Sequence, residues 1–175
     1  MFKNPQYALS DALGVFQFTG VRPGNYVVAI NVTWPPSARY NTSRFPRTFL
    51  PGTPNRSGAR VIELGIEGTA DDLMFQLPKM MPERPVRGRV RWRNGTPVEG
   101  ARVTLLDPEY TREVDICWRT AADGGFSVTG FAGIRYVLTA TFRATSGEEF
   151  KSGPVEVPLD SLSPSNFILD LQGSN

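Results

Sequence analysis

The sequence predicts an all-β protein made of two tandem antiparallel β-sandwiches, of which the first lacks its opening strands. A glycine turn, an alternating apolar segment, a second glycine and a tyrosine occur in the same order at residues 12–27 and again at residues 122–137. The two occurrences are about 110 residues apart, which indicates two modules rather than a solenoid, whose repeat period is roughly 20–50 residues. Apolar and polar residues alternate through much of the chain, as in strands with one buried face, and no segment has a helical period.

The second copy contains the signals of a complete β-domain. Residues 86–93 alternate small or apolar residues with arginines, and Asn94-Gly95 then supplies a dipeptide suited to a tight hairpin turn. We expect seven short strands, at residues 86–93, 101–106, 114–119, 126–128, 136–142, 155–157 and 167–171. Short strands separated by turns are typical of an antiparallel sandwich.

The first copy matches only the later part of this plan. Its expected strands are residues 15–18, 25–32, 59–64 and 73–77, with a long irregular segment over 34–54. No earlier residues correspond to the two opening strands, and a sandwich without them has an unpaired edge. Either the chain is a fragment of a longer repeat array, or another chain, a neighbouring domain or a swapped dimer fills the gap. Prolines at 78, 82 and 85 indicate a short stiff linker. We therefore divide the chain into a truncated repeat, 1–81, and a complete repeat, 82–175.

Composition excludes several classes of function. The chain of 175 residues has a formal charge of +2, too weak to indicate a nucleic-acid partner. It has no histidine and one cysteine, which removes Ser-His and Cys-His nucleophile pairs and the common metal-ligand sets. No apolar run approaches the roughly 20 residues that span a bilayer. We expect no enzyme activity, catalytic residue, metal, cofactor or membrane span.

Several motifs carry a family resemblance. The segments Val86-Arg-Gly-Arg-Val, 95–105 and Asp123-Gly-Gly-Phe, with the later Gly130 and Tyr136, resemble the carboxypeptidase regulatory-like domain. Residues 14–26 carry the matching signature, and Phe-Leu-Pro-Gly-Thr at 49–53 is similar to an element of bacterial members. That family is a small Ig-like sandwich of the transthyretin-like, or Cna protein B-type, fold.

The resemblance implies a non-catalytic structural or interaction module of a larger extracytoplasmic bacterial protein, such as a spacer, an adhesin or an accessory domain. It would be periplasmic, at the cell surface or secreted, with flanking domains of the parent protein or another protein as partners. Some relatives of this fold bind carbohydrate, so the alternative is a carbohydrate-binding module with polysaccharide as its ligand. Others form an isopeptide bond from a first-strand lysine. Here arginines stand in that strand, and because arginine stays protonated we expect no such bond.

The strongest candidate ligand site is a row of arginines on one strand. Alternation places four of them on one face, with neighbours about 6.6–7 Å apart: Arg87, Arg89, Arg91 and Arg93. Guanidinium groups make forked contacts with anionic oxygens, so the row suits an acidic polysaccharide. The alternative is a solvated outer face, paired with carboxylates of a neighbouring strand, that protects an edge strand from aggregation.

A second candidate lies in the irregular segment 34–54, whose aromatic residues are Trp34, Tyr40, Phe45 and Phe49. Exposed aromatic planes stack on sugar rings, so this is the second place where carbohydrate is expected to bind. The alternative is that these side chains anchor a long ordered loop.

The remaining expectations concern polar residues and the core. The acidic residues Asp107, Glu109, Glu113, Asp115 and Asp123 lack the spacing of a calcium loop. Cys117 is expected to point to the polar face beside Asp115 and Arg119. The expected core includes Phe16, Phe18, Tyr26, Phe126, Val128, Tyr136, Leu138 and Phe142. The hydroxyls of Tyr26 and Tyr136 are expected to reach backbone partners.

Overall fold

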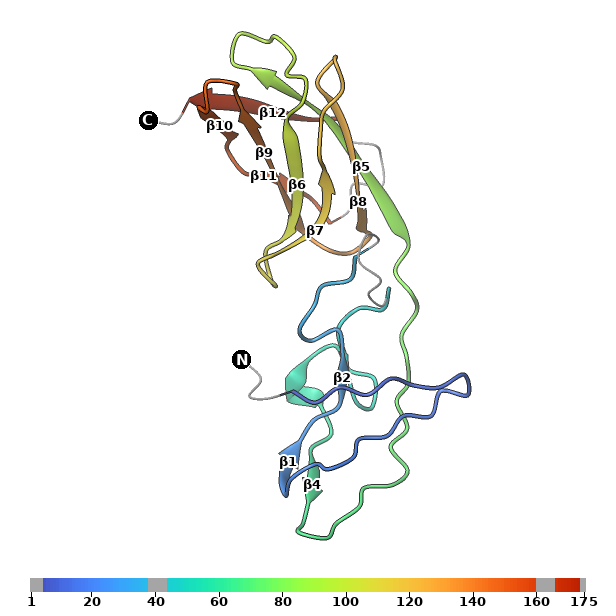
Figure 1. Ribbon diagram of the computed structural model, residues 1–175. Helices are drawn as coiled ribbons and strands as arrows, with labels where there is room; N and C mark the ends of the chain where they lie inside the picture. Colours follow the sequence, from blue (N-terminus) through green and yellow to red (C-terminus); the bar gives the residue numbers. More distant parts are fainter. Residues whose placement is uncertain (1–4, 38–43, 160–165, 174–175) are drawn as a thin grey trace.

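The computed structural model describes residues 5–37, 44–159 and 166–173 and is an all-β structure dominated by one sheet of eight strands (Figure 1). These are β5 (Glu83–Trp92), β6 (Arg102–Asp107), β7 (Arg112–Cys117), β8 (Gly125–Phe131), β9 (Tyr136–Arg143), β10 (Glu149–Ser152), β11 (Val155–Val157) and β12 (Asn166–Gly173). The strand order is β7-β6-β9-β10-β12-β5-β8, and β11 also pairs with β9. The two end strands, β7 and β8, lie next to each other, so the sheet is a nearly closed barrel.

This sheet corrects the predicted fold, because the described residues do not form two tandem sandwiches. The sheet is mixed: β5 runs parallel to β12, with Val90 opposite Leu169, and antiparallel to β8. Alternation in a sequence determines which side chains of a strand face the core, but it does not determine which strands pair. Here the sheet curls until its two ends meet, whereas a sandwich needs two separate layers.

The core of the barrel keeps the alternation of the sequence. Along β5, Val86 and Val90 are buried, while Arg87 and Arg89 are exposed. Between the valines lies Gly88, where an added side-chain carbon would be only 2.6 Å from the ring of Phe126. Glycine therefore makes room for the aromatic ring. Four expected core residues of this half are buried, and a fifth is partly buried: Phe126, Val128, Tyr136 and Leu138, then Phe142.

Strands occur at all seven places expected in this half, and β10 is an additional one. It follows a turn at Gly147, which has a φ of 90°. Its sequence is Glu-Phe-Lys-Ser, whose single apolar residue gives no alternation to read.

The described residues of the first half, 5–37 and 44–81, form only short pairs of strands. β1 (Gly24–Tyr26) pairs with β4 (Ile62–Leu64), β2 (Ala29–Ile30) pairs with β3 (Thr48–Phe49), and η1 (Arg56–Gly58) is a short 3₁₀ turn. Residues 15–18 and 73–77, which were expected to be strands, do not form strands. Two-stranded ribbons are marginal without further layers, so this half has no sandwich core. The strands of the barrel all begin after residue 82, and the division of the chain at residue 81 stays a prediction.

The two copies of the repeated segment differ in burial. Phe126 lies inside the barrel, whereas Phe16 and Phe18 are only partly buried and contact each other edge to face, with ring centres 6.1 Å apart. The prediction that Phe16 and Phe18 belong to a core is therefore wrong, and Tyr26, also expected in the core, is only partly buried. The predictions for the two tyrosine hydroxyls are confirmed. The Tyr26 hydroxyl donates to the carbonyl of Arg22 at 2.7 Å, and the Tyr136 hydroxyl accepts from a backbone N–H of β8 at 2.9 Å.

Candidate functional site

The first half of the chain meets the barrel at the turn between β6 and β7. Asp107, at the end of β6, is buried, and its Oδ1 accepts hydrogen bonds from the backbone N–H groups of Glu109 (2.9 Å) and Tyr110 (3.3 Å). Burial raises the pKa of the Asp107 carboxyl above its ordinary value. This side-chain cap fixes the turn and so the direction in which Tyr110 leaves it.

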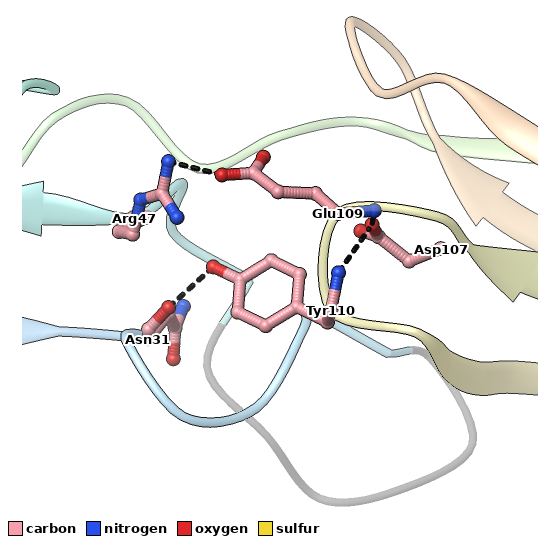
Figure 2. A network of polar contacts seen from close by, with 5 residues as sticks. All are labelled: Asn31, Arg47, Asp107, Glu109 and Tyr110. Carbon is pink, nitrogen blue, oxygen red and sulfur yellow. Dashed lines mark hydrogen bonds and ion pairs between the residues drawn. The ribbon is translucent and has the colours of Figure 1, made fainter. Parts of the chain in front are cut away.

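Tyr110 extends from this turn to the first half (Figure 2). Its hydroxyl donates to the carbonyl oxygen of Asn31 at 2.5 Å, and burial raises the pKa of Tyr110 to about 12. Asn31 has a left-handed backbone, with φ at 51°. The Arg47 guanidinium forms an ion pair with Glu109 and lies 5.8 Å from the centre of the Tyr110 ring. One aromatic side chain therefore carries a hydrogen bond and a cation–π contact between the two halves.

A second contact lies on β7. Residues 35–37 are buried, and the Ser37 hydroxyl donates to the carbonyl of Val114 at 2.5 Å. The Arg112 guanidinium lies 3.9 Å from the centre of the Trp34 ring. Because β7 stands at one end of the strand order, this segment covers part of an edge strand. We call the two contacts together the hairpin contact, formed by Asn31, Trp34, Ser37 and Arg47 of the first half with Asp107, Glu109, Tyr110, Arg112 and Val114.

The arginine row lies on the outside of the barrel. Its members are Arg87, Arg89 and Arg91 on β5, and Arg93 just beyond the strand. Arg89 lies 3.2 Å from a carboxylate oxygen of Asp123, and Arg91 lies 2.6 Å from one of Asp170 on the neighbouring β12. Two members thus have the acidic neighbours that the solvated-face alternative expects. Such partly exposed pairs contribute about 0–1 kcal/mol each. A ligand-binding role for the row stays a prediction.

The aromatic residues of segment 34–54 have different surroundings. Phe49 is buried in β3, and Phe45 is partly buried, its carbonyl accepting a hydrogen bond from the Asn31 side chain at 2.5 Å. Trp34 is half exposed, with Arg112 against its ring. Tyr40 lies outside the described residues. Phe45 and Phe49 fit the anchoring alternative, and sugar stacking by Trp34 and Tyr40 stays a prediction.

The acidic residues considered for calcium have separate protein partners. Glu113 pairs with Arg102 at 3.0 Å, and Asp115 accepts a backbone hydrogen bond from β8 at 2.6 Å. In the described part of the chain, no group of three acidic, cysteine or histidine side chains is arranged to hold a metal ion. Cys117 is partly buried, and its thiol donates to the carbonyl of Arg119 at 3.3 Å.

Sequence reasoning missed the residues that join the two halves. Tyr110 follows Asp-Pro-Glu and so looks like part of a solvated turn, while Asn31 and Arg47 lie in segments without a motif. Arg84 was also missed, although alternation places it on the inward face with Val86. It is buried, and its guanidinium donates to the carbonyl of Pro158 at 2.8 Å.

Comparison of the chain with protein-family models, with curated proteins and with solved structures gives no match. The resemblance to the carboxypeptidase regulatory-like domain therefore rests on the motif residues alone. Among the residues that the structure describes, no helix has the length and apolar character needed to cross a bilayer.

Proposed function

We propose that this chain is a non-catalytic structural and interaction module, in which the barrel is the rigid body and the first half offers apolar side chains to a protein partner. The supporting observation is where the most exposed large apolar side chains lie. In the first half, Leu9 is 95% exposed, Ile66 91%, Leu13 88% and Met74 83%, whereas Trp118, the most exposed in the described barrel, is at 59%.

A physical argument supports a protein partner for this half. Burying apolar surface stabilises a complex by about 25 cal/mol per Å², and Leu9, Leu13, Ile66 and Met74 leave most of their apolar surface in water. The hairpin contact holds the first half against the barrel through Tyr110 and Ser37. None of the four apolar side chains takes part in this contact, so all of them are accessible to a partner. Flanking domains of a larger extracytoplasmic protein, which the family resemblance implies, are the partners we propose.

A photoreactive amino acid placed at Leu13 tests this function. We expect one adduct of defined mass when the chain is expressed in its native cell, because Leu13 would lie in the interface. The matched control carries the same group at Ile168, a half-exposed residue of the barrel strand β12. Equal adducts at both positions, or none at Leu13, would contradict the proposal.

Polysaccharide binding by the barrel is the second candidate, because Arg87 and Arg89 point outward from β5. An array of neutral and acidic polysaccharides tests it. We expect salt-sensitive binding that the double variant Arg87→Ala, Arg89→Ala abolishes, since the two guanidinium groups share one face. Binding that depends on Trp34→Ala instead would assign recognition to the aromatic segment. Background signal throughout would end this candidate.

A further inference from the structure

We propose that the first half binds one extended β-strand of a partner polypeptide, which pairs with residues 15–18 along one edge and with residues 73–77 along the other. This inference rests on the proposed function and deepens it by naming the chemistry of the partner. The ligand is an extended segment with apolar side chains at every second position, recognised through its backbone N–H and C=O groups.

The first half reproduces the glycine turn that leads into β8 of the barrel. In both halves a backbone N–H donates to the carbonyl four residues ahead at 2.9 Å, and a glycine N–H donates back, at 3.0 Å in the first half and 2.8 Å in the barrel. The residues are Asp11, Gly14 and Val15 in the first half, and Ala121, Gly124 and Gly125 in the barrel. The two central glycines have φ values of 81° and 75°. The entry into residues 15–18 is therefore built like the entry into β8.

The first half also reproduces a strand pair of the barrel. Tyr136 of β9 lies opposite Val157 of β11 in an antiparallel pair. Tyr26, which occupies the same place in the repeated segment, lies opposite Ile62 in the antiparallel pair of β1 and β4. The similarity of the two segments therefore extends from sequence to backbone pairing.

The two halves differ at the position of β5. In the barrel, β5 lies between β8 and β12, antiparallel to the first and parallel to the second. In the order of the repeat, residues 15–18 correspond to β8 and residues 73–77 correspond to β12. The described part of the first half contains no strand in the place of β5. The two segments that would flank such a strand are the two that form no strand.

The turn that leads into residues 15–18 is open on the side that β5 covers in the barrel. A side-chain carbon on Gly124 would lie 2.3 Å from the carbonyl oxygen of Val90 on β5, whereas one on Gly14 would meet no atom within 4 Å. Val15 and Met74, from the two segments, are mostly exposed. An alternating strand laid between the segments would bury these side chains and pair with the backbone groups that face it, as β5 does for β8 and β12. The Val15 N–H already donates to the Asp11 carboxylate at 2.8 Å and the Gln76 N–H to the Pro51 carbonyl at 2.9 Å, so these two groups face away from the proposed strand.

The test is to supply such a strand. The sequence of residues 83–92 is attached before Met1 of the full chain through a Gly/Ser linker of about 30 residues, which spans roughly 30 Å. Amide hydrogen exchange is then measured. We expect the amides that face the added strand, every second one in 15–18 and in 73–77, to exchange about tenfold or more slowly than in the unextended chain, because ladder hydrogen bonds protect them. The control extension has prolines in place of its two valines and should leave both segments unprotected. Protection of one segment only, or of neither, would overturn the inference.

This result can be separated from the test of the proposed function. Adducts at Leu13 without protection in the extended chain would mean that a partner binds the first half without adding a strand, which overturns the inference alone. Protection without adducts at Leu13 would mean that the first half can pair with a strand but has no partner, which overturns the proposed function and, because it rests on that function, the inference as well.

Discussion

The side-chain carboxylate of Asp115 on β7 accepts a hydrogen bond from the backbone N–H of Thr129 on β8, with 2.6 Å between oxygen and nitrogen. The two strands stand at opposite ends of the strand order, and the sheet has no backbone ladder between them. A second oxygen of the same carboxylate accepts from the N–H of Ile116 at 2.8 Å. A side chain thus bridges the two ends of the sheet where a ladder is missing.

Removing this bridge should loosen the closure of the barrel. We expect Asp115→Ala to lower the free energy of unfolding by about 1–3 kcal/mol, because the Thr129 amide is left without its acceptor. Asp115→Asn keeps an oxygen acceptor and should lose less. Urea unfolding followed by tryptophan fluorescence measures both changes. Equal stability of the two variants and the unmodified chain would show that the bridge does not stabilise the fold.

Asp107 should make stability depend on pH. Burial raises its pKa in the folded chain, so the folded state keeps the proton to higher pH than the unfolded state does. Its contribution to the free energy of unfolding is therefore fully present below the unfolded pKa of about 3.9 and is lost as the pH rises through the folded pKa.

Asp107→Asn cannot ionise but keeps an acceptor for the two N–H groups of the turn. We expect the variant to gain stability relative to the unmodified chain as the pH rises through this window, and the difference to stay constant above it. Urea unfolding at a series of pH values measures the difference. A slope of the opposite sign would mean that the backbone hydrogen bonds to the carboxylate outweigh its burial.

Tyr110→Phe tests the hairpin contact. Loss of the hydroxyl leaves the Asn31 carbonyl without this donor, and we expect the free energy of unfolding to fall by about 0.5–1.5 kcal/mol. The spectroscopic titration should also lose a tyrosine that ionises at a pKa of about 12. Tyr7→Phe is the matched control, because the Tyr7 hydroxyl also has a hydrogen-bond partner, the Thr33 hydroxyl at 3.3 Å, but at an exposed site. If Tyr7→Phe lowered the free energy of unfolding as much as Tyr110→Phe does, the hairpin contact would have no special role in stability.

Gly88→Ala tests the close approach of β5 to its neighbours. The new carbon would lie 2.2 Å from the carbonyl oxygen of Phe167 and 2.6 Å from the ring of Phe126. Since the barrel must shift to accept it, we expect a loss of about 1–3 kcal/mol. Gly153→Ala, where an added carbon meets nothing within 4 Å, should change stability by less than about 0.5 kcal/mol. Thermal unfolding of the two variants decides between these outcomes.

The strands of the barrel could be predicted because each buries one face, as Val86 and Val90 do on β5. Their arrangement could not. No local feature of residues 86–92 or 167–171 shows that they are parallel neighbours, because this pairing depends on the closure of the whole sheet. The same alternation predicts that the Arg87 side chain faces outward, as it does in the structure. The contact between Tyr110 and Asn31 joins segments that are distant in the chain, so no local sequence pattern predicts it.

The repeated segment was misleading because its local and non-local parts behave differently. The turn at Gly14 and the pairing of Tyr26 need only nearby residues, and both are present in the structure. Burial of Phe16 needs a long strand across it, as Phe126 has in β5. That strand is not among the described residues of the first half, so the same motif gives a turn and a ribbon instead of a sandwich.

Native-state amide hydrogen exchange, measured residue by residue by NMR, tests the central claim that the described part of the chain forms one nearly closed mixed sheet and no second sandwich. We predict slow exchange at Val90, Val128 and Leu169 in the barrel, and exchange close to that of an unfolded chain at Phe16 and Phe18. Protection of Phe16 and Phe18 equal to that of Val128 would contradict the claim.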